Sequence, residues 1–74
     1  MDEKTAGRIR KLSRAAKQSA ESAADDREAR DAAFWEADEQ GATLAEIARA
    51  AEMSTGHVQR IVIRQTSDRQ VVLP

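Results

Sequence analysis

Hydrophobic residues between positions 43 and 63 repeat with a helical period, break once, and then resume. Those before the break share one face of a helix, with the spacing i, i+3, i+4 and i+7: Leu44, Ile47, Ala48 and Ala51. Those after the break share the inner face of a second helix: Val58, Ile61 and Val62. Two helices that are this short and this close must cross steeply to bury both faces. The pattern therefore predicts a helical pair joined by a tight turn.

Polar residues mark the ends of this predicted pair. Thr43 precedes the first helix and Glu46 follows three residues later, which is the spacing of a capping box. Ser54 can cap the second helix, and Met53 places an apolar side chain in the turn. The capping residues and the apolar turn residue thus indicate the same helix boundaries as the hydrophobic pattern.

A further helix is predicted from residue 3 to about residue 23, because this stretch is rich in helix formers and has no proline. Its apolar stripe is narrow and consists of Ile9, Leu12, Ala16, Ala20 and Ala23. Such a helix needs a surface to lie on, either the body of the domain or a partner. The alternative is a frayed and solvated basic arm.

The next predicted helix runs from about residue 27 to residue 40, with Asp25 and Asp26 as caps and Gly41 directly after its end. Phe34 shares a face with small residues and is expected in the core. Trp35 is rotated from Phe34 by about 100°. We expect Trp35 to meet the N-terminal helix or a second subunit, or else to lie partly exposed on its own helix.

The helical pattern is lost from Thr66 onward. Ser67 and Asp68 are typical turn residues, and the run 71–73 is short, apolar and β-prone. We expect a loosely packed tail, with an added strand edge, a cover over the core or a dimer contact as alternatives.

The segment 43–63 resembles the helix-turn-helix motif of small bacterial and phage transcriptional regulators. That motif has an apolar residue followed by alanine, a small residue near the end of its first helix, and apolar residues in the turn and the second helix. The matching residues are Ile47, Ala48, Ala51, Met53, Val58 and Ile61. One position departs from the pattern, because Glu52 stands where glycine is usual. A left-handed conformation there costs another residue roughly 1 kcal/mol.

The resemblance implies an all-α fold, with a three-helix helix-turn-helix core, an additional N-terminal helix and a short C-terminal tail. Residues 1–24 would form the basic N-terminal helix, used for packing or dimerisation. Residues 25–65 would form the helix-turn-helix domain, and residues 66–74 the tail.

The resemblance also implies that the second helix of the pair enters the major groove of DNA. The residues placed to contact bases or phosphates are Thr43, Arg49, Ser54, Thr55, Gly56, His57, Gln59, Arg60 and Arg64. Gln59 can pair with adenine, Arg60 with guanine or a phosphate, and Thr55 can touch a thymine methyl group. Arg49 and Arg64 are candidate phosphate contacts, or else solvated side chains.

Composition argues against several function classes. The 74 residues include one His, no Cys and no Tyr, and no metalloprotease, P-loop or dinucleotide-binding motif. We therefore expect a binding protein with no catalytic residue, no metal site and no cofactor. No apolar run approaches the ~18 residues of a membrane span, and no secretory signal is present. These observations predict a cytoplasmic, nucleoid-associated protein without membrane contact.

Charge is distributed unevenly along the chain. The net charge of −1 argues mildly against nucleic-acid binding, since domains that bind phosphate are usually basic. Residues 1–17 carry a net charge of +4, residues 18–46 carry −7 and residues 47–74 carry +2. Such asymmetry is typical of a molecule with one face for a polyanion and another for solvent or a protein partner.

Together these observations favour a small transcriptional regulator, such as a repressor, that binds double-stranded DNA in a sequence-specific manner. A homodimer is expected, because a single recognition helix covers few base pairs and an alanine-rich core of this size is marginal alone. Two alternatives share much of this evidence. One is a protein-interaction module that uses the acidic segment 18–46, and the other is an accessory DNA-binding factor in phage or plasmid recombination.

Overall fold

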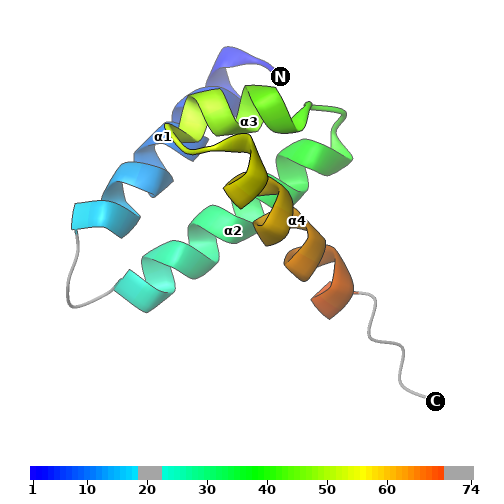
Figure 1. The fold of residues 1–74 in the computed structure, drawn as a ribbon. Coiled ribbons are helices and arrows are strands. Elements are labelled where there is room, and N and C mark those ends of the chain that lie inside the picture. Colours follow the sequence, from blue (N-terminus) through cyan, green and yellow to red (C-terminus); the bar gives the residue numbers. More distant parts are fainter. Residues whose placement is uncertain (19–22, 70–74) are drawn as a thin grey trace.

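Four helices and no strand make up the part of the chain that the computed structural model describes, residues 1–18 and 23–69. The helices are α1 (Glu3–Gln18), α2 (Ala23–Glu39), α3 (Leu44–Ala51) and α4 (Thr55–Arg69). Figure 1 shows α1 and α2 side by side and antiparallel, with α3 across one end and α4 leading away from it. Within these residues α4 packs mainly on α2 and α3. The all-α class and the additional N-terminal helix are confirmed.

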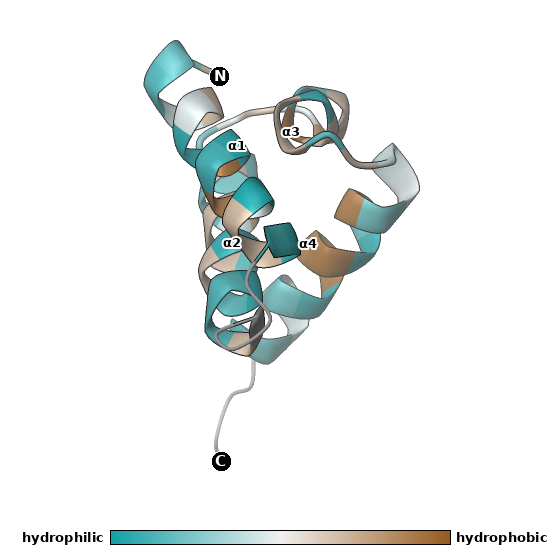
Figure 2. Cartoon of the chain, turned by 90° about the vertical axis from the view of Figure 1, so that its left-hand side faces the viewer, coloured by the Kyte–Doolittle hydropathy of each residue, from teal (hydrophilic) through white to brown (hydrophobic). Residues whose placement is uncertain are grey.

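Side chains from all four helices meet in one hydrophobic core. Its largest fully buried apolar members are Ile9 of α1, Phe34 of α2, Ile47 of α3, and Val58 and Ile61 of α4. In Figure 2 the most hydrophobic part of α4 lies in the middle of the helix. Because Ile9 is fully buried in this shared core, α1 is a structural part of the domain and not a solvated arm.

The helix α1 begins at Glu3, as the sequence predicts. Asp2 caps the helix, since the Thr5 N–H donates to Asp2 Oδ1 at 2.8 Å. This hydrogen bond is the largest cause of the lowered pKa of the Asp2 carboxyl. The described helix runs from Glu3 to Gln18, and residues 19–22 of the predicted stretch lie outside the described residues. Ala20 of the predicted stripe falls outside the described residues, whereas Ala16 is buried as expected.

The start of α2 lies elsewhere than predicted. The helix begins at Ala23, so Asp25 and Asp26 stand in its first turn and do not cap it. The prediction was wrong because acidic residues are favoured both at the N-cap and in the first turn of a helix. At the N-cap they accept hydrogen bonds from backbone N–H groups, and in the first turn they stabilise the positive end of the helix dipole.

Gly41 follows the end of α2, as the sequence predicted. Its φ of 98° is left-handed, and its N–H donates to the Asp38 carbonyl at 3.0 Å. The next N–H, that of Ala42, donates to the Ala37 carbonyl at 3.0 Å. These two bonds form a Schellman motif, which stops α2 and turns the chain toward α3.

Trp35 is partly exposed, which is one of the alternatives that the sequence left open, and it contacts the end of α4, which was not among them. The guanidinium of Arg69 lies over the Trp35 ring at 4.1 Å from its centroid. This contact requires α4 to continue through Ser67 and Asp68, so the prediction of a non-helical tail from Thr66 was wrong. The run 71–73 lies outside the described residues.

Candidate functional site

All nine residues predicted to contact DNA are exposed: Thr43, Arg49, Ser54, Thr55, Gly56, His57, Gln59, Arg60 and Arg64. Seven of them belong to α4 or to the residue that caps it. Thr43 stands at the start of α3 and Arg49 near its end. The structure therefore concentrates the candidate site on α4, with two residues contributed by α3.

The position of α4 is set by its inner face and by the turn before it. Val58, Ile61 and Val62 are buried against the rest of the core. Glu52 adopts the left-handed conformation that the sequence pattern required, with φ 59° and ψ 43°. The Met53 N–H donates to the Ala48 carbonyl at 3.0 Å, which closes the turn. A buried face and a closed turn hold the opposite face of α4 toward solvent.

The solvent face of α4 contains one residue that the sequence analysis missed. At about 100° per residue, Gly56, Arg60 and Ile63 lie opposite the buried face. Ile63 has 58% of its surface exposed, and Met1 is the other exposed large hydrophobic residue within residues 1–18 and 23–69. The helical period of the inner face could have revealed it, because Ile63 falls directly after the buried pair 61–62 and points away from it.

Backbone donors are available where α4 begins. Ser54 Oγ accepts the His57 N–H at 3.2 Å, so this hydroxyl is a helix cap in the structure, as predicted. The N–H groups of Thr55 and Gly56 have no hydrogen-bond partner among the described residues. Nothing lies within 4 Å of the position that a Cβ of Gly56 would occupy. A helix start with open N–H groups attracts anions.

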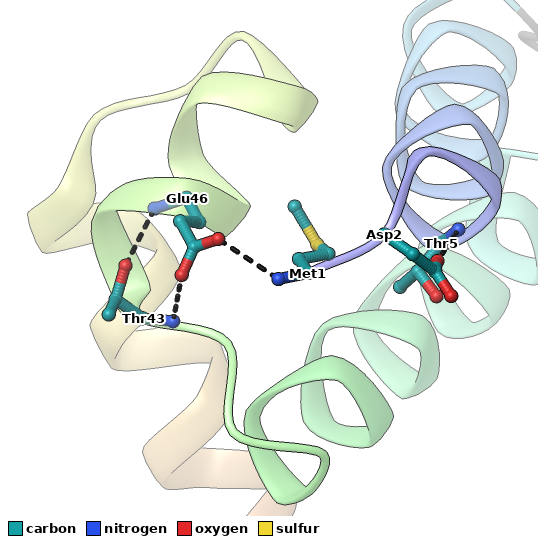
Figure 3. Close-up of polar contacts among 5 residues, drawn as sticks. All are labelled: Met1, Asp2, Thr5, Thr43 and Glu46. Carbon is teal, nitrogen blue, oxygen red and sulfur yellow. Dashed lines mark hydrogen bonds and ion pairs between the residues drawn. The ribbon is translucent and has the colours of Figure 1, made fainter.

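The start of α3 holds the predicted capping box (Figure 3). The Glu46 N–H donates to Thr43 Oγ1 at 3.1 Å, and the Thr43 N–H donates to Glu46 Oε1 at 3.0 Å. The amino group of Met1 pairs with Glu46 Oε2 at 3.1 Å. The hydrogen bond from the Thr43 backbone is the largest cause of the lowered pKa of Glu46. Since its N–H is engaged, Thr43 has only its hydroxyl hydrogen left to offer a ligand.

Two arginines of the candidate site differ from Arg8 and Arg14 of α1 in their partners. Within residues 1–18 and 23–69, Arg60 and Arg64 form no ion pair and no hydrogen bond. By contrast, Arg8 pairs with Glu36 at 2.9 Å and Arg14 pairs with Glu52 at 3.0 Å. No carboxylate occurs on α4 between Thr55 and Ser67. The exposed charge of α4 is therefore positive and uncompensated within that stretch.

Acidic groups closest in sequence to the start of α4 are paired with cations from the N-terminal segment. Glu52, two residues before Ser54, binds Arg14 of α1. Glu46 binds the amino group of Met1. Exposed pairs of this kind contribute little to stability, but they reduce the negative potential beside the candidate site.

Arg49 lies apart from the α4 residues. It lines a cavity of about 180 Å³ between α1 and α3, together with Arg10 and the small residues Ala6 and Ala50. Arg10 and Arg49 are both without an ion-pair partner among the described residues. Sequence spacing could not have grouped them, because they come from helices that are distant in the chain.

Two further observations concern other classes of site. Within residues 1–18 and 23–69 no group of three or more His, Cys, Asp or Glu side chains is placed to hold a metal ion. No helix in that part of the chain is long and apolar enough to cross a membrane. Comparisons with protein-family models, with curated proteins and with solved structures found no match.

Proposed function

We propose that the protein binds double-stranded DNA in a sequence-specific manner, with α4 as the recognition helix in the major groove. The observation that carries this proposal is the solvent face of α4. It presents unpaired Arg60 and Arg64 with no intervening carboxylate, while its opposite face is anchored in the core. A rigid, exposed and cationic helix fits the width and charge of the groove.

Each end of this helix has a distinct task in the proposed complex. Gln59 and Arg60, one turn into α4, would meet base edges, Gln59 by pairing with adenine and Arg60 with guanine. The open N–H groups of Thr55 and Gly56 would donate hydrogen bonds to a phosphate oxygen. The Thr43 hydroxyl and the Arg64 guanidinium would bind the sugar-phosphate backbone and fix the orientation of the helix.

The biological role that suits this chemistry is that of a small transcriptional regulator, such as a repressor. Two copies would bind half-sites about one helical turn apart, which is how single recognition helices gain specificity. An accessory factor in phage or plasmid recombination would use the same contacts, so the proposal for α4 covers both roles.

The rival proposal is a protein-interaction module based on the acidic segment 18–46. At least three of its carboxylates are already paired within the described residues. Glu36 binds Arg8 of α1 and Asp31 binds Arg30 of its own helix, both at 2.9 Å, and Glu46 binds the amino group of Met1 at 3.1 Å. This internal pairing leaves less of the segment for a partner, whereas Arg60 and Arg64 of α4 form no ion pair. DNA binding is therefore the better-supported function.

The test is selection of bound duplexes from a random DNA library, carried out with the whole chain at a low and a high salt concentration. We expect one enriched sequence motif and an affinity that falls steeply with salt, with a logarithmic slope near −0.9 for each phosphate contacted. Absence of binding at low salt would contradict the proposal and leave the protein-interaction module. Binding without any enriched motif would contradict its sequence-specific part.

A further inference from the structure

Ile63 is the feature of the candidate site that phosphate or polar base contacts do not explain. It is one of two exposed large hydrophobic residues within residues 1–18 and 23–69, the other being Met1 at the chain end. Ile63 lies in the third turn of the 15-residue α4, well inside the helix. A β-branched residue at a mostly exposed helical position gains little burial and has lower helix propensity than alanine or leucine. The folded monomer therefore gives Ile63 little stabilising role.

The neighbours of Ile63 on the helix surface belong to the candidate site. At about 100° per residue, Ile63 lies within roughly 60° of Gly56, Gln59 and Arg60. It stands one turn beyond Gln59 on the same exposed face. A binding partner that contacts Gln59 and Arg60 from the solvent side therefore also covers Ile63.

The groups around Ile63 indicate which chemical groups that binding partner must present. Arg60 and Arg64 flank it with free positive charge, and no carboxylate lies beside it on α4. The partner must then be anionic and also present an apolar group within the footprint of a helix. In the major groove of DNA the apolar group at a base edge is the C5-methyl of thymine.

We propose that Ile63 is a specificity-determining residue that contacts a thymine methyl group. This inference rests on the proposed function of α4. Ile63 follows Arg60 by three residues, which is about 4.5 Å along the helix axis. Base pairs are spaced by about 3.4 Å. The thymine is therefore expected one or two base-pair steps from the base that Arg60 contacts.

The test uses the duplex enriched from the random library, with each thymine replaced in turn by deoxyuridine, which lacks only the methyl group. The whole chain and its Ile63→Ala variant are titrated with every duplex by fluorescence anisotropy. For the unaltered protein, replacement of one particular thymine should weaken binding about threefold to fivefold, as expected for one buried methyl group. The other thymines of the same duplex serve as internal controls.

The Ile63→Ala variant should bind the thymine duplex severalfold more weakly and lose its sensitivity to that one replacement. Its thermal unfolding should match that of the unaltered protein, because the side chain is exposed. A variant with undiminished affinity and unchanged sensitivity at every thymine would overturn the inference while leaving DNA binding intact. Loss of a dimer on Ile63→Ala in sedimentation without DNA would also overturn it, by placing Ile63 between two copies. Failure to enrich any motif would instead overturn the proposed function, and the inference with it.

Discussion

Glu46 connects two parts of the molecule that are 45 positions apart in sequence. Its carboxylate accepts the Thr43 N–H in the capping box of α3 and also binds the amino group of Met1. Both contacts favour the charged form, and the hydrogen bond from the Thr43 backbone is the larger cause of its lowered pKa. At the scale of single residues, the carboxylate of Glu46 is therefore paired within the domain, whereas the guanidinium of Arg60 is unpaired.

The lowered pKa of Glu46 predicts a dependence of stability on pH. Because the folded-state pKa lies below the ordinary value of 4.5, this stabilisation is fully present above about pH 5 and is lost as pH falls through the folded-state pKa. Glu46→Gln keeps an oxygen for the Thr43 N–H but removes the charge. In urea unfolding, the variant should be less stable than the unaltered protein near neutral pH, and the difference should shrink toward about pH 3. A difference that stays constant over this range would contradict the prediction.

Arg60→Ala should weaken binding to the selected duplex by about 1–3 kcal/mol and leave the fold intact. The reason is that Arg60 is exposed and unpaired, so its removal costs the fold nothing but deprives the proposed complex of a base or phosphate contact. Fluorescence anisotropy measures the affinity, and circular dichroism checks the fold.

The matched control for Arg60→Ala is Arg27→Ala, which removes the same charge from an exposed position on α2. Arg27→Ala should reduce the affinity for DNA only slightly, because it removes one positive charge from the protein. Equal losses in the two variants would remove Arg60 from the candidate site.

At the scale of elements, the turn between α3 and α4 decides where the exposed face of α4 points. Glu52 tolerates a left-handed conformation there, and Ala48 is buried and supplies the carbonyl that closes the turn. Small residues are needed on α3 because bulky ones would push the two helices apart. The element pair is therefore sensitive to changes on its inner face and tolerant on its outer face.

Ala48→Glu should unfold or disorder the domain, because a carboxylate placed at a site that is 4% exposed has no partner. Ala45→Glu is the matched control, since Ala45 is exposed on the same helix and a carboxylate in the first turn suits the helix dipole. Thermal unfolding followed by circular dichroism distinguishes the two variants. A cooperative transition for Ala48→Glu near that of the unaltered protein would show that the packing of α3 against its neighbours is not as described.

Replacements of Glu52 measure the cost of its left-handed backbone. Glu52→Gln removes the ion pair with Arg14 and keeps the strain, whereas Glu52→Gly removes both. Relief of the left-handed strain should make Glu52→Gly more stable than Glu52→Gln by up to about 1 kcal/mol. The greater freedom of glycine in the unfolded chain lowers this difference in the free energy of unfolding. The measurement is the free energy of unfolding in urea. If Glu52→Gly proves less stable than Glu52→Gln, the turn is not strained at this position.

At the scale of the whole molecule, α1 completes the core that the other helices leave open. Ile9 is fully buried and Leu12 packs against the core. A domain of 74 residues has a stability of roughly 4–11 kcal/mol, so burial of Ile9 is a substantial part of it. From the sequence, the apolar stripe of this helix could lie either on the body of the domain or on a partner; in the structure both side chains pack within one chain. The argument for a homodimer therefore rests on the need for two DNA half-sites.

We predict that the chain forms a homodimer on its selected duplex, with two copies on half-sites related by symmetry. Sedimentation equilibrium should give two protein chains for each duplex at saturation. The free protein is expected to associate only weakly, because little of its large apolar surface is exposed apart from Ile63 and Met1 in the described residues. A single chain on a non-symmetric site would contradict this prediction.

Local interactions explain which parts of the molecule could be derived from the sequence. The helical period, the capping box and the left-handed turn residue act within a few positions of each other, so the α3–α4 pair and the exposure of its candidate residues followed from residues 43–63 alone. Contacts between distant segments decided the rest. The helix α4 continues past the expected end and brings Arg69 over Trp35 of α2, and Arg49 lines a cavity with Arg10, which comes from a distant part of the chain. The inclusion of α1 in the core, through Ile9, is likewise a matter of tertiary packing. Periodicity identifies the face that a helix buries, whereas the partner that covers this face is determined by the arrangement of the whole chain.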